Sequence, residues 1–70
     1  MTSLERLVHM VNQIATNLAT DADPVTATAE HIQLFWDPRM KKMILESNRD
    51  GLSPVAAAAI DRLAQAHASA

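Results

Sequence analysis

Three histidines, His9, His31 and His67, are the side chains of this sequence best suited to bind a metal ion or to transfer protons at neutral pH. No two of them are three or four residues apart, the spacing that would place two ligands on one face of a helix. No motif sets a general base beside a serine or threonine, as nucleophilic catalysis requires. Cysteine is absent, which excludes thiolate metal sites and cysteine nucleophiles. The sequence therefore predicts a chain that is not an enzyme by itself and has no catalytic, cofactor-binding or metal-binding residues.

The distinctive side chains concentrate instead in residues 31–40, which hold the only Phe and the only Trp of the chain. Phe35 and Trp36 are sequence neighbours, so they cannot both face the same way, and one can fill the core while the other lies outside. Two interpretations are open at this point. Either both rings wrap around a sharp corner as core residues, or one of them forms an interface together with Arg39. Trp and Arg are enriched among the residues that dominate binding energies.

Three cations follow the aromatic pair, in the first turns of an expected helix, where the helix dipole disfavours positive charge. Local stability does not explain this placement, so the cations form either a solvated basic face or a docking site for an acidic surface. Met40 shares a helical stripe with Met43, and methionine adapts to partner surfaces, although a core position is the commoner one. The candidate partner-binding residues are Phe35, Trp36, Arg39, Met40, Lys41 and Lys42.

Prolines and capping residues predict the elements that position these side chains. Asp23-Pro24, Asp37-Pro38 and Ser53-Pro54 each combine a good N-cap with a proline suited to the first helical position. A capping-box pattern at the N-terminus marks a fourth helix start. Together with apolar residues at helical spacing, these signals predict an all-α fold of four helices with short connections. The helices are expected at about residues 3–19, 24–36, 38–49 and 54–67.

Asp37 has a double role in this prediction. A residue before proline disfavours the helical conformation, so Asp37 should end the second helix and cap the third. Asp37 and Pro38 would then form a structural corner without a linker. Gly51 is expected as the residue with positive φ that follows the third helix, because glycine adopts that conformation at little cost.

Length and composition limit what the chain can do alone. Its 70 residues predict a single helical domain over 1–70, with a thin core because much of the 49% hydrophobic content is alanine and short aliphatics. Chains of this size usually gain stability from a disulfide, a metal or a partner. The net charge of −2 argues against nucleic-acid binding. Neither a secretory signal nor a membrane-spanning stretch is visible, so we expect a cytoplasmic protein. The thin core leads us to expect that a partner protein stabilises it.

The block Phe35-Trp36-Asp37-Pro38-Arg39-Met40, followed by a basic amphipathic helix, resembles the small delta subunit of NAD-dependent, molybdenum-containing formate dehydrogenase. The flanking residues agree with that family over the first helix, at Leu7-Val8, Met10 and Asn12-Gln13-Ile14-Ala15, and over the last helix, at Gly51-Leu52-Ser53-Pro54 and the alanine-rich end. The resemblance covers most of the chain.

This resemblance implies a non-catalytic subunit of a cytoplasmic enzyme that oxidises formate to carbon dioxide and passes electrons to NAD. It implies that the molybdenum-pterin cofactor, iron–sulfur clusters and FMN are held by larger subunits and that this chain binds none. We expect the corner to dock on the catalytic (alpha) subunit, near where the molybdenum cofactor is inserted or enclosed, and to support assembly, cofactor maturation or stability.

In that mode Trp36 or Phe35 would be the apolar anchor, Arg39 the polar anchor, and Lys41 and Lys42 the rim. The alternative is a free-standing helical adaptor or regulator that binds another protein or self-associates through its alanine-rich last helix. A homodimer of the isolated chain is compatible with both interpretations.

Overall fold

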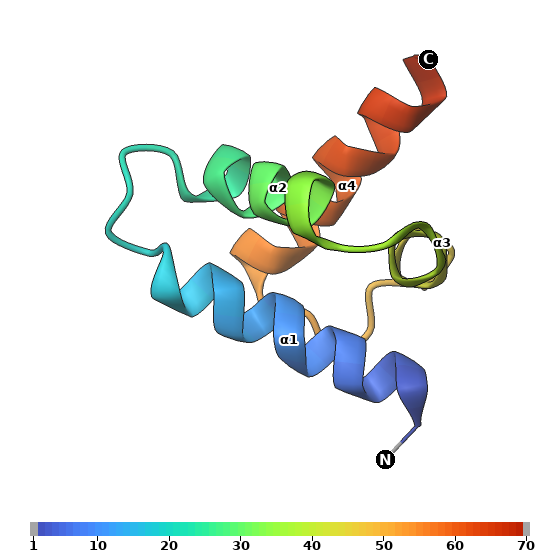
Figure 1. The fold of residues 1–70 in the computed structure, drawn as a ribbon. Helices are drawn as coiled ribbons and strands as arrows, with labels where there is room; N and C mark the ends of the chain where they lie inside the picture. Colours follow the sequence, from blue (N-terminus) through green and yellow to red (C-terminus); the bar gives the residue numbers. More distant parts are fainter. Residues whose placement is uncertain (1, 70) are drawn as a thin grey trace.

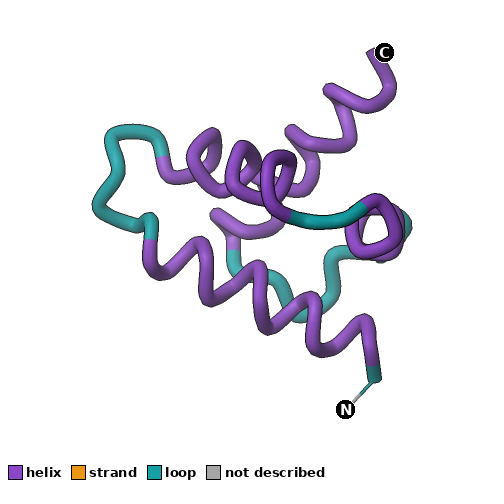
Figure 2. The backbone as a smooth tube through the Cα atoms, in the orientation of Figure 1, coloured by secondary structure: helices purple, strands orange, loops and turns teal. Residues whose placement is uncertain are grey.

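The fold consists of four helices in the part of the chain that the computed structural model describes, residues 2–69 (Figure 1). They are α1 (Ser3–Asn17), α2 (Pro24–Phe35), α3 (Pro38–Leu45) and α4 (Pro54–Ser69). No strand occurs among these residues, and Figure 2 shows only loops between the helices. The all-α prediction is confirmed.

The first two helices begin where the capping residues predict. The Thr2 hydroxyl accepts a hydrogen bond from the Glu5 backbone N–H at 3.1 Å, and the Glu5 carboxylate accepts one from the Thr2 N–H at 3.0 Å. The backbone bond from Thr2 is the main cause that lowers the pKa of the Glu5 carboxyl. Asp23 caps α2 by accepting from the Thr26 N–H at 3.2 Å. Hydrogen bonds from the Thr26 hydroxyl and N–H likewise lower the pKa of Asp23.

The last two helices begin in the same way. The Asp37 carboxylate accepts from the Met40 N–H at 2.9 Å, and the Ser53 hydroxyl accepts from the Ala56 N–H at 3.3 Å. Each cap satisfies a donor that has no partner within its own helix. The three prolines each occupy the first position of their helix. All four predicted helix starts are therefore confirmed.

The core lies where α1, α2 and α4 meet, with α2 and α4 forming the most extensive helix pair. Figure 1 shows α1 running beneath α2 and α4, with α3 at one side. Among the fully buried residues of α4 are Ala56 and Ala59, whose small side chains let another helix approach closely. From α3 only Ile44 is buried. The side chains of the central cluster are Leu7, Val11, Ala15, Ile32, Trp36, Ile44, Ala56, Ile60 and Leu63.

The predicted end of the third helix, at about Arg49, is wrong: α3 ends at Leu45. Arg49 has a φ of 71°, in the left-handed region, and its guanidinium donates to the carbonyls of Leu45 at 3.0 Å and Ser47 at 2.6 Å. It also forms an ion pair with Asp61 of α4 at 2.9 Å. If the helix continued, the carbonyls of Leu45 and Ser47 would accept hydrogen bonds from later backbone N–H groups. The Arg49 side chain donates to them instead, so the helix can end early. Gly51 does have a positive φ, 83°, but lies within the following loop.

The other helix ends differ from the prediction by one or two residues, at Asn17, Phe35 and Ser69. Such differences are within the usual fraying of helix termini.

Thr28 of α2 provides a stability prediction, because its side chain is fully buried and its hydroxyl has no hydrogen-bond partner within the described chain. Thr28→Val keeps the shape and removes the unsatisfied group, so we expect unfolding to cost about 1 kcal/mol more. Urea denaturation followed by circular dichroism measures this. Thr26→Val is the matched control, because the Thr26 hydroxyl donates to Asp23 at 2.7 Å and accepts from Arg62. That control should lose stability; a loss in Thr28→Val would contradict the prediction.

Candidate partner-binding surface

The two aromatic neighbours at the end of α2 have opposite environments. Trp36 is 6% exposed and belongs to the core cluster, whereas Phe35 is 72% exposed. The Phe35 ring contacts His31, one helical turn earlier, with ring centroids 4.8 Å apart. Leu34, beside it, is 74% exposed. The choice that the sequence left open is thus decided: Trp36 fixes the segment to the core, and Phe35 is the ring that a partner can reach.

The corner that holds Phe35 consists of two residues, Trp36 and Asp37, both in extended conformation. The Trp36 N–H donates to the Ile32 carbonyl at 3.0 Å, and the Asp37 carbonyl accepts from the Lys41 N–H at 3.1 Å. With the Asp37 cap and the ring of Pro38, these bonds leave little freedom between α2 and α3. The predicted corner is therefore present, and it sets how Phe35 and α3 are presented together.

Two of the three cations on α3 have a local role that the sequence did not reveal. The Lys41 ammonium donates to the Gln33 carbonyl at 3.3 Å, in the last turn of α2, where a positive charge is favoured. Since α3 is only eight residues long, Lys42 lies in its last turn, where the dipole also favours a cation. Arg39 alone remains in the first turn of α3, exposed to solvent.

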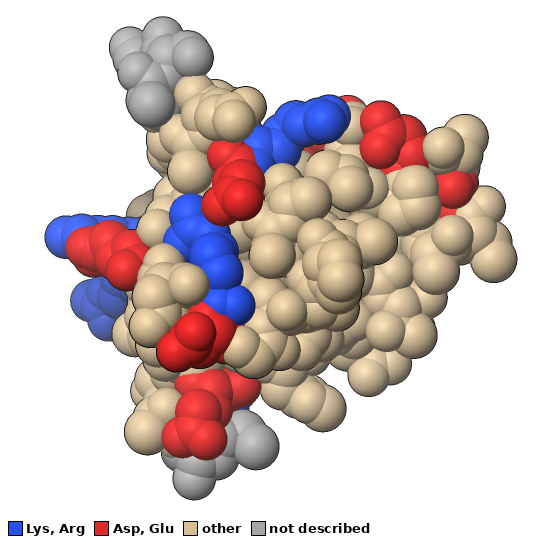
Figure 3. All heavy atoms as spheres, turned by 180° about the vertical axis from the view of Figure 1, so that it is seen from behind, with Lys and Arg blue, Asp and Glu red and all other residues tan. Residues whose placement is uncertain are grey.

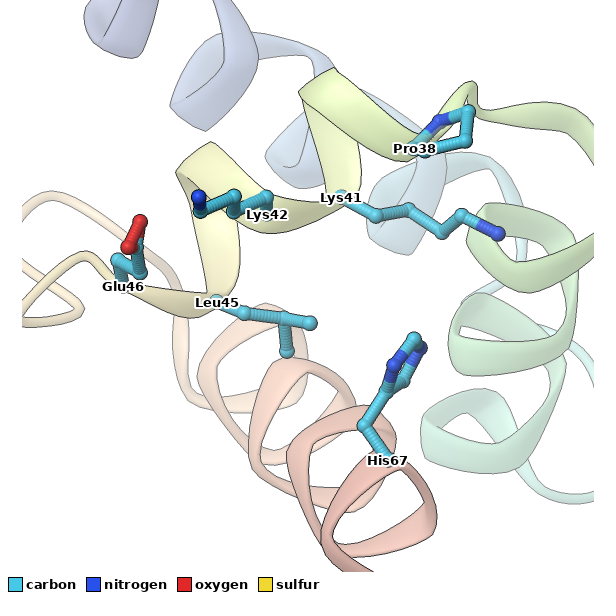
Figure 4. Close-up of a pocket in the computed structure, with 6 residues that line it drawn as sticks. All are labelled: Pro38, Lys41, Lys42, Leu45, Glu46 and His67. Atoms are coloured by element: carbon cyan, nitrogen blue, oxygen red, sulfur yellow. The ribbon is translucent and has the colours of Figure 1, made fainter. Parts of the chain in front are cut away.

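One side of α3 faces α4 across an open groove of about 560 Å³. Figure 4 shows Lys41 extending from α3 towards α2, and His67 rising from α4 into the same space. The His67 Nε2 lies 3.3 Å from the Gln33 side-chain oxygen. The arrangement offers apolar contacts and hydrogen bonds at the edge but no convergent catalytic groups. The lining residues are Pro38, Lys41, Lys42, Leu45, Glu46 and His67.

The other side of α3 faces α1 across a second groove, of about 320 Å³. Arg39 and Met40 lie here, so the structure divides the predicted residues between the two sides of α3. Met43, for which the sequence favoured the core, is 40% exposed. Three residues that are exposed or line this groove were not among the predicted ones: Leu34, Arg6 and Met10. Met10 could have been found from the sequence, because it is a methionine that lies off the apolar stripe of the first helix. The lining residues are Ser3, Arg6, Leu7, Met10, Asp37, Arg39, Met40 and Met43.

The charged side chains on the face opposite to that of Figure 1 do not form a patch of a single sign. Figure 3, which shows this face, has basic and acidic groups interspersed at the left and a second mixed group at the top and upper right, whereas the middle of the face is largely uncharged. No three His, Asp or Glu side chains converge as a metal site within the described part of the chain. No helix of residues 2–69 is both long and apolar enough to cross a bilayer.

Comparison with known proteins assigns the chain to a family. A model of the NADH-dependent formate dehydrogenase delta subunit family, FdsD, matches residues 6–60, which include the corner, α3 and most of α1. No curated protein matches the chain, and no solved structure matches it. The matched range covers most of the 70 residues. The chain therefore belongs to the family of formate dehydrogenase delta subunits.

Proposed function

We propose that the chain is a non-catalytic accessory subunit that docks on the catalytic subunit of formate dehydrogenase through the corner and α3. In this role it supports assembly, cofactor maturation or stability of the complex. Family membership supports association with the formate dehydrogenase complex.

The observation that carries the proposal is the 72% exposure of Phe35 on a segment whose neighbour, Trp36, is anchored in the core. Leu34, the neighbour of Phe35 in the sequence, is 74% exposed, so the end of α2 has two large apolar side chains in solvent. A protein surface that gathers such groups is typical of an interaction site. Because the corner already holds the Phe35 backbone in place, little conformational freedom is lost when a partner covers the ring.

The small core makes docking useful to both partners. A domain of this size draws only about 3–5 kcal/mol from its core, so a partner that binds only the folded state adds substantially to its stability. A rigid helical corner in turn can cover apolar surface on a larger subunit while that subunit is being assembled. Accessory subunits that act in this way need no catalytic group of their own.

Phe35→Ala in the co-expressed complex tests the proposal. We expect co-purification of the chain with the catalytic subunit to fall by about tenfold or more, the effect of a central aromatic anchor. The melting temperature of the isolated variant should stay close to that of the wild type, because an exposed side chain contributes little to folding. Phe35→Leu keeps an apolar side chain there and should retain most of the binding.

The same preparations are assayed for formate-dependent NAD reduction and for molybdenum content, beside a complex expressed without this chain. Loss of activity or of molybdenum in both samples supports the accessory role. Undiminished co-purification of Phe35→Ala would contradict docking through this ring. Full activity and metal loading without the chain would contradict the role in assembly.

A further inference from the structure

The groove between α1 and α3 has an unusual lining for so small a domain. It contains Met10, Met40 and Met43, which are all the methionines of residues 2–69, with Leu7 beside them. Met10 and Met43 are each 40% exposed, so the groove keeps apolar surface in solvent. Methionine side chains are flexible and polarisable and adjust to the shape of an incoming apolar group.

Two arginines, Arg6 and Arg39, lie at the same groove. Neither guanidinium has a hydrogen bond or an ion pair with any part of the chain that the structure describes. Arg6 stands near the start of α1 and Arg39 near the start of α3, where the helix dipole disfavours a cation. Asp37 also lines the groove, but its carboxylate already caps α3 through the Met40 N–H. Folding therefore gives no reason for two positive charges at this place.

We propose that this groove receives an amphipathic segment of the partner subunit, with an apolar side chain among the methionines and carboxylates against Arg6 and Arg39. The choice of occupant follows from charge complementarity: two unpaired guanidinium groups at an apolar groove match an acidic, apolar segment. At about 320 Å³ the groove is near the lower end of the range for small-molecule sites, and it has room for one large side chain of another protein. That the segment belongs to the catalytic subunit rests on the proposed function.

Charge reversal tests the polar half of the proposal in the co-expressed complex. Arg6→Glu combined with Arg39→Glu should weaken retention of the chain on its partner by about tenfold or more, because like charges would then meet. Both substitutions place a carboxylate near a helix start, where the dipole favours it, so the fold should be kept. Arg62→Glu on α4 is the control cation outside the groove; because Arg62 donates to the Thr26 hydroxyl, retention of this variant is compared per folded fraction, measured by circular dichroism, and should then be close to that of the wild type. Unchanged retention of the double variant would overturn the proposal.

Met43→Lys tests the apolar half, because it fills the groove with a charged chain without adding a negative charge. Retention should fall although the added positive charge suits an acidic segment. Stronger retention would show that charge alone drives binding and would overturn the role of the methionines. Circular dichroism of the isolated Met43→Lys chain checks that the fold is kept, as we expect because Met43 is 40% exposed.

Photo-methionine incorporated only into this chain locates the occupant. Since the described methionines all line the groove, crosslinks in the purified complex should map to a peptide of the catalytic subunit that carries both Asp or Glu and apolar residues. Crosslinks confined to copies of this chain would mean that a second copy fills the groove, and would overturn the proposal. If Phe35→Ala weakens docking while the groove variants do not, the groove fails and the proposed function stands. If none of the variants weakens docking, both fail.

Discussion

Trp36→Ala should unfold most of the isolated chain at room temperature. The indole is 6% exposed and packs within the central cluster beside residues such as Ile32 and Ile44. Truncating a buried Trp to Ala costs about 3–5 kcal/mol, which is about what the whole core of a domain this small supplies. Far-UV circular dichroism of the isolated chain should therefore show a large loss of helix. Fluorescence cannot be the readout, because Trp36 is the only Trp of the chain.

Trp36→Phe is the control for this change. It keeps an aromatic ring in the core and should melt between the wild type and Trp36→Ala. Because the alanine variant loses the fold, it should lose partner binding in proportion, and excess partner should restore part of its helix by mass action. A Trp36→Ala chain that melts like the wild type, or that stays folded while losing its partner, would contradict the core assignment and place the indole in the interface.

The helix starts could be predicted because they depend on neighbours in the sequence. Asp23, Asp37 and Ser53 each cap the N–H of a residue three positions on, and each precedes a proline. The Thr2 capping box is equally local. Nothing distant has to be known for these contacts to form, so the pattern alone places the starts and the corner between α2 and α3.

The end of α3 and the role of its lysines depend on contacts between elements. Arg49 stops the helix because its guanidinium reaches back to the α3 carbonyls and across to Asp61, twelve positions on. Lys41 caps α2 only because the corner folds α3 beside the Gln33 carbonyl, eight positions back. Sequence spacing does not show such contacts, so a longer helix and an unexplained basic face were the natural expectations.

The candidate surface could be predicted only in part, for a similar reason. The sequence located it at the aromatic corner, but the choice between Phe35 and Trp36 depends on how that corner turns against the core. Met10 and Met40 are far apart in sequence and meet only because α1 lies against α3. The sequence pattern therefore predicted the segment, and the packing shows which of its side chains are exposed.

Asn12→Ala should cost about 1–3 kcal/mol of unfolding free energy, chiefly because it leaves the partly buried Ser53 N–H without its partner. The Asn12 amide joins α1 to the loop between α3 and α4 with both of its groups. Its NH₂ donates to the Gly51 carbonyl at 2.9 Å, and its oxygen accepts from the Ser53 N–H at 2.9 Å. Urea denaturation of the isolated chain, followed by Trp36 fluorescence and by circular dichroism, measures the loss.

Asn12→Asp separates the two bonds, because a carboxylate still accepts from Ser53 but repels the Gly51 carbonyl instead of donating to it. It should therefore be less stable than the wild type at neutral pH. Gly51→Ala tests the same attachment from the loop side. Its φ of 83° disfavours alanine, and the added Cβ would lie 3.3 Å from Val8 Cγ1. If Asn12 and Gly51 hold one attachment, Asn12→Ala and Gly51→Ala together should cost measurably less or more than their sum.

The attachment at Asn12 bears on docking as well as on folding. Only Ile44 of α3 is buried, so that helix is held against α1 chiefly by the corner at one end and by the loop to α4 at the other. Loosening the loop should let α3 move and change the methionine groove without touching any of its lining residues. Asn12→Ala should then weaken partner retention by more than its fraction of unfolded chain predicts. If partner retention follows the folded fraction alone, the corner is sufficient to place α3. If Asn12→Ala lowers the free energy of unfolding by less than about 0.5 kcal/mol, the two hydrogen bonds do not hold the loop.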